Sequence, residues 1–375
     1  MHVVATRETE NGEFRAALVP TGVEQLVKDG FDVSVQSGIG LYAGFSDQMY
    51  SELGANVEVE ANKLLNEADI ALHVRKPNKD SVSQLKSDAI HISFLDPFLD
   101  PGLVESMAQQ RITAVSLEMV PRSTRAQKMD ALSSQASLAG YAAVITAAYH
   151  LPRIFPMMMT PAGTISPTRV FVIGAGVAGL QAIATAHRLG ARIEAFDTRP
   201  VVAEEVRSLG AKFVEIDIGE TGQTEQGYAK ALTPEQIEMQ RKGMAKVVAR
   251  SDVVITTAQV FGRRAPKIVT SDMIQAMDET SVVVDMAVET GGNVEGSQLN
   301  QIVECGGVKI VGLGNLPSHV AGHASEMYSS NLVHFIREFN TEESGTIRLD
   351  PENDIAKACV LTRDGQVLHA FSNGK

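Results

Sequence analysis

The sequence has few cysteines: Cys305 and Cys359 are the two in 375 residues, and they lie far apart. Disulfide scaffolds and structural zinc sites need more cysteines at short spacing, so the sequence argues against both and favours a reducing compartment. A dense run of lysine and arginine is also missing, and the formal net charge is −12. Such a charge repels a phosphate backbone, so we expect no nucleic-acid partner.

Long apolar runs are scarce as well. Residues 1–20 carry acids early and lack the apolar core of a signal peptide. Residues 131–151 contain no Asp, Glu, Lys or Arg, and their length would suit a membrane-spanning helix. This stretch is nevertheless rich in alanine and contains four serine and threonine residues, a glutamine and a histidine. The composition favours a long buried helix with close neighbours over a membrane span.

The remaining pattern alternates short apolar runs with helical periodicity, at a length that suits two domains of about 150 residues. This rhythm predicts an α/β fold: two Rossmann-like subdomains with mostly parallel sheets, the second carrying the dinucleotide motif. The strands are expected at 2–6, 31–36, 68–74, 89–95, 111–117, 169–173, 252–258, 281–288 and 308–314. The clearest helices are expected at 21–30, with Thr21 as N-cap and Gly30 as stop, at 131–151 and at 324–339. Prolines predict a connector over 156–168, and polar composition predicts an exposed loop over 219–236.

A glycine motif follows the apolar run 169–173. Gly174, Gly176 and Gly179 have the spacing G-x-G-x-x-G and lead into a helical pattern. The first permits a tight turn, the second lets a pyrophosphate approach, and the third lets the helix pack closely on the strand. Asp197 ends the next strand, where a carboxylate accepts ribose hydroxyls and repels the 2′-phosphate of NADP. The motif predicts NAD(H) binding; the alternative is a glycine-rich turn without a ligand.

Other strand ends carry polar or small residues, at 256–259 and at 285–293. Ligands of open α/β sheets bind at the carboxyl ends of strands, so these ends are candidates to line the nicotinamide half. Asp285 has an equal alternative as a structural acid that caps a turn. His319 and His323 lie four residues apart but lack the acid of an H-E-x-x-H motif, which favours a loop entering a helix over zinc. We expect Met157–Met159 to serve core or hinge packing rather than a metal.

Residues 15–20, Arg-Ala-Ala-Leu-Val-Pro, resemble a motif near the start of alanine dehydrogenases and of domain I of proton-translocating NAD(P) transhydrogenases. The resemblance continues through 172–191, 196–200, 256–270, 282–293 and 315–318, and it covers essentially the whole chain. Two segments, 121–141 and 227–232, are similar to the transhydrogenase branch in particular. Where alanine dehydrogenases hold pyruvate with a lysine and a histidine, this chain has Arg75 and Asp96.

The resemblance implies site residues beyond those that the glycine motif gives. It places the hydride-transfer roles on Arg122, Gln127, Asp130 and Ser133, with Gln127 reaching toward the incoming NADP(H). For that segment the alternative is a solvated, N-capped helix start. From the histidine, cysteine and methionine spacing above, we expect no metal site. The NAD(H) contacts that the resemblance implies fall on Gly174, Gly176, Val177, Ala178, Gly179, Asp197, Thr198, Arg199, Tyr228, Ala258, Gln259, Glu289 and Asn315, with Tyr228 in a closing loop.

The resemblance also implies a function: direct hydride transfer from NADH on this chain to NADP⁺ on a partner domain. That reaction needs two rings held at contact distance and no acid, base or nucleophile. It further implies a homodimer with domains 1–131 plus 321–375 and 132–320, and an NADP-binding and a membrane-spanning proton-translocating partner. We expect a cytoplasmic protein that is peripheral on the bacterial inner membrane. The alternatives are an alanine dehydrogenase-like enzyme, which Arg15 and Lys76 keep open, and an NAD-sensing module without turnover.

Overall fold

The computed structural model describes residues 1–219, 232–341 and 345–371, which form two compact units. The first unit combines Met1–Gln135 with Ser318–Lys375, and the second is the continuous segment Ala136–Pro317. Each unit is built on its own sheet of mainly parallel strands, so the predicted α/β fold class is confirmed. The predicted limits of independent domains stay a prediction.

The sheet of the first unit is fully parallel, in the order β3-β2-β1-β4-β5-β6. Its strands are β1 (His2–Ala5), β2 (Asp32–Gln36), β3 (Asn56–Glu58), β4 (Ile70–Leu72), β5 (Ile90–Ser93) and β6 (Thr113–Ser116). Val3 and Ala5 pack into one core cluster, while Val4 packs into another. Alternate residues of β1 therefore face opposite sides of the sheet, and both faces are covered, as parallel sheets require.

Short helices connect these strands. They are α1 (Pro20–Lys28), α2 (Asp47–Glu52), α3 (Ala61–Glu67), α4 (Lys79–Gln84) and α5 (Pro101–Gln109), with 3₁₀ turns at Leu41–Ala43, Leu117–Met119 and Gln127–Met129. Helix α1 begins at Pro20, after Val19, which makes no side-chain cap. The prediction of Thr21 as N-cap was wrong, because a proline has no amide hydrogen to satisfy and its ring presets the helical φ. Gly30 follows the helix at φ +89°, as a helix stop requires.

The last part of the chain completes the first unit. Helix α11 (Ala321–Phe339) supplies Tyr328, Leu332 and Phe335 to the core that β1 and α1 line. The Tyr328 hydroxyl donates to the carbonyl oxygen of His73 at 2.8 Å. Helix α12 (Asp354–Cys359) and the small hairpin β16 (Thr362–Arg363) and β17 (Gln366–Val367) follow. The predicted helix at 324–339 is confirmed and begins three residues earlier.

The sheet of the second unit has the order β11-β10-β9-β12-β13-β15-β14, and only its edge strand β14 runs antiparallel. Its strands are β9 (Arg169–Ile173), β10 (Arg192–Phe196), β11 (Lys212–Phe213), β12 (Val253–Thr256), β13 (Val282–Asp285), β14 (Gln301–Cys305) and β15 (Val308–Gly312). Val170 and Val172 pack on one face of β9, and Phe171 and Ile173 pack on the other. The second sheet is therefore also buried on both sides.

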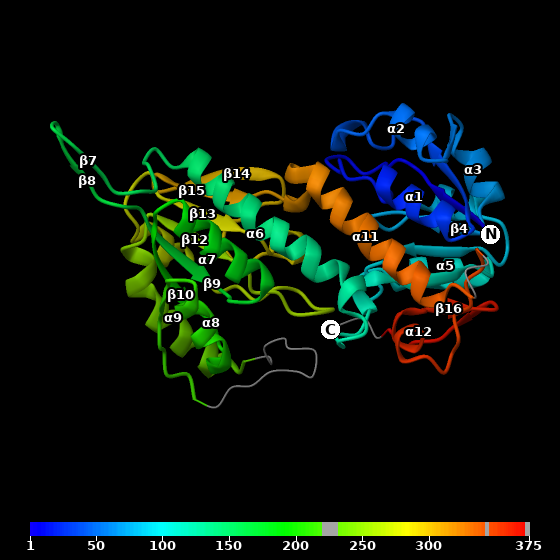
Figure 1. The fold of residues 1–375 in the computed structure, drawn as a ribbon. Coiled ribbons are helices and arrows are strands. Elements are labelled where there is room, and N and C mark those ends of the chain that lie inside the picture. Colours follow the sequence, from blue (N-terminus) through cyan, green and yellow to red (C-terminus); the bar gives the residue numbers. More distant parts are fainter. Residues whose placement is uncertain (220–231, 342–344, 372–375) are drawn as a thin grey trace. The chain divides into compact units, whose positions relative to one another are not determined.

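Helices cover both faces of this sheet (Figure 1). They are α6 (Ala131–His150), α7 (Val177–Arg188), α8 (Ala203–Ser208), α9 (Pro234–Ala249) and α10 (Ser271–Gln275), with 3₁₀ turns at Pro200–Val202, Val288–Thr290 and Leu316–Val320. Helices α6, α7 and α8 contribute to one core cluster, and α9 and α10 contribute to the other. The predicted loop over 219–236 was wrong at its end, because Thr233 and Gln236 form a capping box that starts α9.

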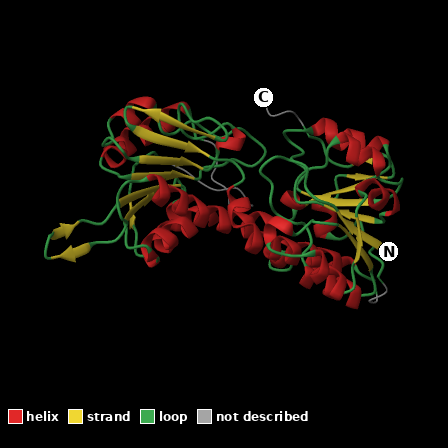
Figure 2. Cartoon of the chain, turned by 90° about the horizontal axis from the view of Figure 1, so that it is seen from above, coloured by secondary structure: helices red, strands yellow, loops and turns green. Residues whose placement is uncertain are grey.

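Three further expectations differ from the structure. The predicted connector over 156–168 contains a hairpin, β7 (Met158–Thr160) and β8 (Gly163–Ile165), drawn as the isolated pair of yellow arrows in Figure 2. Met157, Met158 and Met159 are 58%, 44% and 73% exposed, so they do not pack in a core. Helix α6 forms as predicted, but its Tyr141, Ile145 and Tyr149 are exposed rather than buried. Among the described residues, no helix is both long enough and apolar enough to cross a membrane.

Candidate functional site

The sheet order of the second unit brings most predicted site residues to one edge. Strand β9 lies between β10 and β12, so the chain leaves β9 toward one side and later returns on the other. This is a topological switch point, and ligands of such sheets bind outside the carboxyl ends of the strands there. The ends of β9, β10, β12, β13 and β15 carry, respectively, the glycine motif, Asp197, Ala258, Glu289 and Asn315.

The glycine motif forms a tight strand-to-helix turn. Gly174 has φ +99°, and a Cβ there would lie 2.5 Å from the hydroxyl oxygen of Thr257. A Cβ on Gly179 would lie 1.9 Å from the carbonyl oxygen of Gly174. Gly174 therefore allows the residues that follow β12 to approach the turn, and Gly179 allows α7 to pack against the end of β9.

Gly176 differs from these two, because its surroundings are open. Among the described residues, a Cβ on Gly176 would meet one atom within 4 Å, Nη2 of Arg199 at 3.9 Å. The first turn of α7 follows directly at Val177, Ala178 and Gly179, and its amide N–H groups favour an anion. The turn thus offers open space beside the amides of a helix start, which suits a pyrophosphate.

Asp197 is held at the end of β10 by its own loop. Its Oδ2 accepts from the amide of Ala175 at 2.7 Å and from Nη2 of Arg199 at 2.9 Å. Its Oδ1 accepts from the amide of Arg199 at 2.8 Å and from Nε of Arg199 at 2.9 Å. The two side chains are 6% and 14% exposed, and Thr198 between them is half-buried. The structure thus ties the glycine turn to the acid that follows the next strand.

The ends of β12 and β13 are linked by one buried network. Asp285 is fully buried, and its carboxylate accepts from the amides of Ala287, Asn293 and Val294 and from the Thr256 hydroxyl, at 3.1–3.2 Å. Asn293 in turn accepts from the amide of Ala258 at 3.0 Å and donates to its carbonyl at 2.8 Å. Of its two interpretations, Asp285 therefore takes the structural one: it caps the loop and holds Ala258 in place through Asn293.

Glu289 and Asn315 come together although 26 residues separate them. The amide of Asn315 donates to Oε2 of Glu289 at 3.1 Å, and Asn315 has φ +50°, in the left-handed region that asparagine tolerates. Gln259 is exposed, and its Nε2 donates to the carbonyl of Met286 at 3.4 Å. These three polar groups extend the edge from β12 across β13 to β15.

The residues predicted from segment 121–135 belong to the first unit. Asp130 caps the start of α6: its carboxylate accepts from the amide of Ser133 at 2.9 Å and from the Ser133 hydroxyl at 2.6 Å. Arg122 and Gln127 are exposed, and Gln127 begins a 3₁₀ turn. The capped helix start is therefore present, and two exposed polar side chains precede it. Tyr228 lies outside the described residues.

Arg15 is committed to a buried ion pair with Glu13. Its Nε and Nη2 donate to the Glu13 carboxylate at 2.8 and 2.6 Å, and its Nη1 donates to Gln135 at 2.9 Å. Nε of Arg75 approaches the same carboxylate at 3.1 Å. Burial acts to raise the pKa of Glu13, but the hydrogen bonds and charge of Arg15, with the charge of Arg75, outweigh it and lower the pKa to about 2. Asp96 is exposed at φ +50°.

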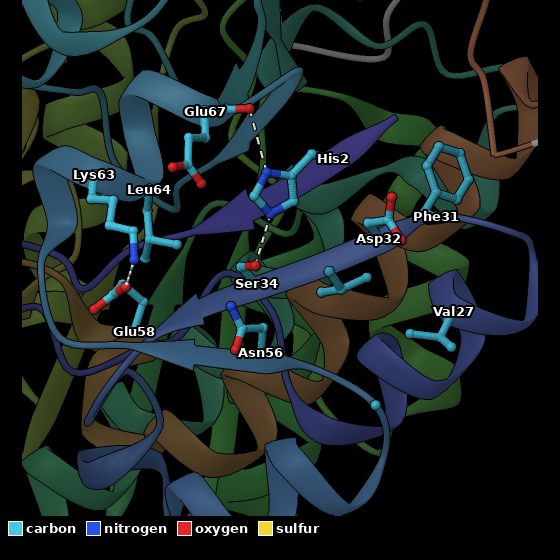
Figure 3. Close-up of a pocket in the computed structure, with 12 residues that line it drawn as sticks. His2, Val27, Phe31, Asp32, Ser34, Asn56, Glu58, Lys63, Leu64 and Glu67 are labelled. Carbon is cyan, nitrogen blue, oxygen red and sulfur yellow. Dashed lines mark hydrogen bonds and ion pairs between the residues drawn. The ribbon is translucent and has the colours of Figure 1, made fainter.

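A pocket of about 500 Å³ opens elsewhere in the first unit, beside β1, β2 and α3 (Figure 3). His2 is among its lining residues, and its Nε2 is hydrogen bonded to the Ser34 hydroxyl at 2.7 Å. His2 and Asp32 begin β1 and β2, so the pocket lies toward the amino ends of the strands. None of the predicted site residues that the structure describes lines it, and ligands of parallel sheets bind at the opposite edge.

One supporting residue was not predicted from the sequence. A Cβ on Gly140, in α6, would lie 2.2 Å from the carbonyl oxygen of Ala178, so α6 approaches the start of α7 as closely as a glycine allows. The abundance of small residues in 131–151 was the available signal, but it does not tell which small residue makes the contact. Gly140 thus allows α6 to pack against the start of α7, beside the glycine turn.

The comparisons with known proteins cover nearly the whole chain. Residues 4–139 match the family model described as alanine dehydrogenase/PNT, N-terminal domain, and residues 143–370 match its C-terminal counterpart. The chain is 42% identical to the first part of the NAD(P) transhydrogenase alpha subunit of Rickettsia prowazekii (strain Madrid E), over 98% of this chain and 96% of that one. The corresponding protein of Rhodospirillum rubrum is 40% identical over the full length of both.

A solved structure agrees with these sequence matches. The crystal structure of transhydrogenase from Sinorhizobium meliloti aligns with a TM-score of 0.88 at 42% identity, covering 98% of this chain and 100% of that one. The family models, the similar proteins and the solved structure thus indicate the same family. The chain belongs to the alanine dehydrogenase/PNT family, in the branch of the NAD(P) transhydrogenase alpha subunits.

Proposed function

We propose that this chain is the NAD(H)-binding component of a proton-translocating NAD(P) transhydrogenase. The observation that carries the proposal is the open turn at Gly176, at the switch point of the second sheet. The amide N–H groups at the start of α7 and the carboxylate of Asp197 lie next to it. In this role the dinucleotide supplies the hydride, which passes directly to NADP⁺ held by a partner domain.

In this function, the site residues of the chain bind the dinucleotide, orient it or exclude water. Gly174, Gly176 and Gly179, with the amides of Val177 and Ala178, hold the pyrophosphate. Asp197 holds the adenosine ribose, and Thr198 and Arg199 lie beside it. Ala258, Gln259, Glu289 and Asn315 line the remainder, and the family resemblance adds Tyr228, which lies outside the described residues. The buried network around Asp285 and Asn293 supports Ala258, because it fixes the backbone from which Ala258 projects.

The family resemblance assigns the orientation of the reacting ring to a second group of residues. Arg122 holds polar groups of the nicotinamide half, and Asp130 with Ser133 fixes the carboxamide. Their mutual hydrogen bonds hold these two side chains ready before any ligand arrives. Gln127 is exposed, which allows it to reach the NADP(H) of the partner.

The proposal includes the assembly in which the chain works. We infer a homodimer that docks onto an NADP-binding domain and a membrane-spanning, proton-translocating domain. The chain is then cytoplasmic and peripheral on the inner membrane. Hydride transfer requires the partner, because the second dinucleotide is bound there.

A mixing experiment tests the proposal. The purified chain is combined with a transhydrogenase NADP-binding domain loaded with NADP⁺, and NADH carrying deuterium on its transferable position is added. Deuterium in NADPH only when both proteins are present supports the proposal. If NADH binds tightly and no label moves, the hydride-transfer function is refuted and an NAD-sensing module takes its place.

The same sample serves a second assay, for the alanine dehydrogenase alternative. Pyruvate and ammonia are added with NADH, and oxidation of NADH is followed. We expect none, because the guanidinium of Arg15 is already paired with Glu13 and Gln135, and Asp96 offers no imidazole as acid or base. Turnover with pyruvate would reverse the choice between the two functions.

A further inference from the structure

The carboxylate of Asp197 is saturated within its own loop. A carboxylate has about four acceptor positions, and the described contacts supply four hydrogen bonds: two from backbone amides and two from the side chain of Arg199. The ribose hydroxyls of a dinucleotide need acceptor positions on this same carboxylate. The two bonds that can be released are those from the Arg199 side chain, because the backbone bonds are fixed by the turn.

We propose that Arg199 sets the selectivity of this chain between NAD(H) and NADP(H), by occupying and neutralising the carboxylate that reads the ribose. The inference rests on the proposed function, since it concerns the same dinucleotide site. Arg199 has two opposed effects on ligands. It competes with ribose hydroxyls for Asp197, and it screens the negative charge that repels a 2′-phosphate.

The position of Arg199 allows both effects. Its Nη2 lies 3.9 Å from where a Cβ on Gly176 would be, so the guanidinium borders the open space of the turn. The pair with Asp197 is bidentate and largely shielded from water, at 14% and 6% exposure, so its charges are screened by solvent less than a surface pair. Glu205, on α8, adds a second negative charge that acts on Arg199 and would act on a phosphate.

Removal of the guanidinium should therefore change the affinities for NAD(H) and NADP(H) in opposite directions. NAD(H) gains free acceptor positions on Asp197, while NADP(H) meets an acid whose charge is no longer compensated. The ratio of the Kd for NADPH to the Kd for NADH should rise. Asp197→Asn removes the negative charge and leaves the positive charge of Arg199 uncompensated. A 2′-phosphate is then attracted rather than repelled, so the same ratio should fall.

The experiment measures both dissociation constants, from nucleotide fluorescence, for the wild-type chain and the variants. Arg199→Gln should raise the ratio about tenfold or more, corresponding to about 1.4 kcal/mol. Arg199→Lys keeps the charge but cannot make the same two side-chain bonds to Asp197, so its ratio should lie between those of the wild type and Arg199→Gln. Arg192→Gln is the matched control: it removes one exposed positive charge from the amino end of the same strand and should leave the ratio unchanged.

The outcomes separate this inference from the proposed function. An unchanged ratio in Arg199→Gln, with the variant folded by circular dichroism and NADH still bound, overturns the role of Arg199 and leaves the proposed function intact. A rise of equal size in Arg192→Gln also overturns it, because the effect would then follow from net charge alone. If the wild-type chain binds neither dinucleotide, the proposed function fails, and this inference fails with it.

Discussion

Gly179 meets the carbonyl of Gly174 so closely that a Cβ on Gly179 would lie 1.9 Å from that oxygen. We expect Gly179→Ala to lower the free energy of unfolding by about 1–3 kcal/mol, because the start of α7 must move away from β9. Urea unfolding followed by circular dichroism measures this. Gly102→Ala, in α5, is the control, since a Cβ there meets no described atom within 4 Å. Equal stability of the two variants would contradict the packing role of Gly179.

Gly176 should behave in the opposite way. Its φ is −80°, which any residue adopts, and its surroundings are open, so Gly176→Ala should keep the melting temperature of the wild type. NADH affinity should fall about tenfold or more, because the methyl group stands where the pyrophosphate approaches the backbone. Calorimetric titration and a thermal melt on the same sample check both parts. Undiminished affinity would mean that the pyrophosphate does not lie over this turn.

Asp285 tests whether a buried acid at a strand end is structural. Asp285→Ala leaves the amides of Ala287, Asn293 and Val294 without their acceptor, at a cost of about 3 kcal/mol or more. Chemical unfolding measures this loss. The exposed Asp272 is the control, and its alanine variant should lose less than about 1 kcal/mol. A folded, fully stable Asp285→Ala that fails only in NADH binding would make Asp285 a ligand contact instead.

His73 governs part of the dependence of stability on pH. It is buried between the Thr6 hydroxyl and the ring of His91, at 2.7 and 3.1 Å, and burial lowers its pKa from 6.5 to about 4. A histidine with a lowered folded-state pKa stabilises the fold fully above 6.5, and this contribution is lost as pH falls from 6.5 through 4. The loss from His73 is about 3 kcal/mol over that range.

Urea unfolding at pH 7, 5.5 and 4 measures the effect. His73→Gln does not titrate, so its stability should fall less steeply with decreasing pH than that of the wild type. His187→Gln removes an exposed histidine and should keep the wild-type slope. Identical slopes for wild type and His73→Gln would show that another group governs the acid sensitivity.

Gln127 separates binding from transfer. Gln127→Asn shortens an exposed side chain by one methylene, so the fold and NADH affinity should stay as in the wild type. Hydride transfer to NADP⁺ on the partner should slow, because a side chain that positions the second dinucleotide no longer reaches it. Single-turnover rates with the NADP-binding domain measure this, with Gln109→Asn as an exposed control on α5. A variant that mainly loses NADH affinity would refute the assignment.

The sequence was sufficient where local chemistry decides the structure. The strand of 169–173, the three glycines and Asp197 lie within one β-turn-α-β unit, so their arrangement follows from a short stretch of chain. The edge strands β3, β11 and β14 were missed. The first two have only three and two residues, and β14 is partly exposed and antiparallel, so none shows a long apolar run.

What could not be predicted depends on residues far apart in the chain. The bond between Asn315 and Glu289, and the support of Ala258 by Asn293, join loops 26 and 35 residues apart. No periodicity encodes such pairs. The saturation of Asp197 by Arg199 was closer to hand, since two residues separate them, but a sequence does not tell whether an arginine turns back onto the acid or away from it.

The return of α11 to the first sheet has a consequence for biosynthesis. Tyr328 and Phe335 belong to the same core as Val3 and Leu18. This core therefore lacks the side chains of α11 until residues near 340 have left the ribosome. The second unit is continuous and needs no later segment. We therefore expect the ribosome-bound chain to fold from its middle outward, with the first sheet unfinished and open to chaperones until translation is almost complete.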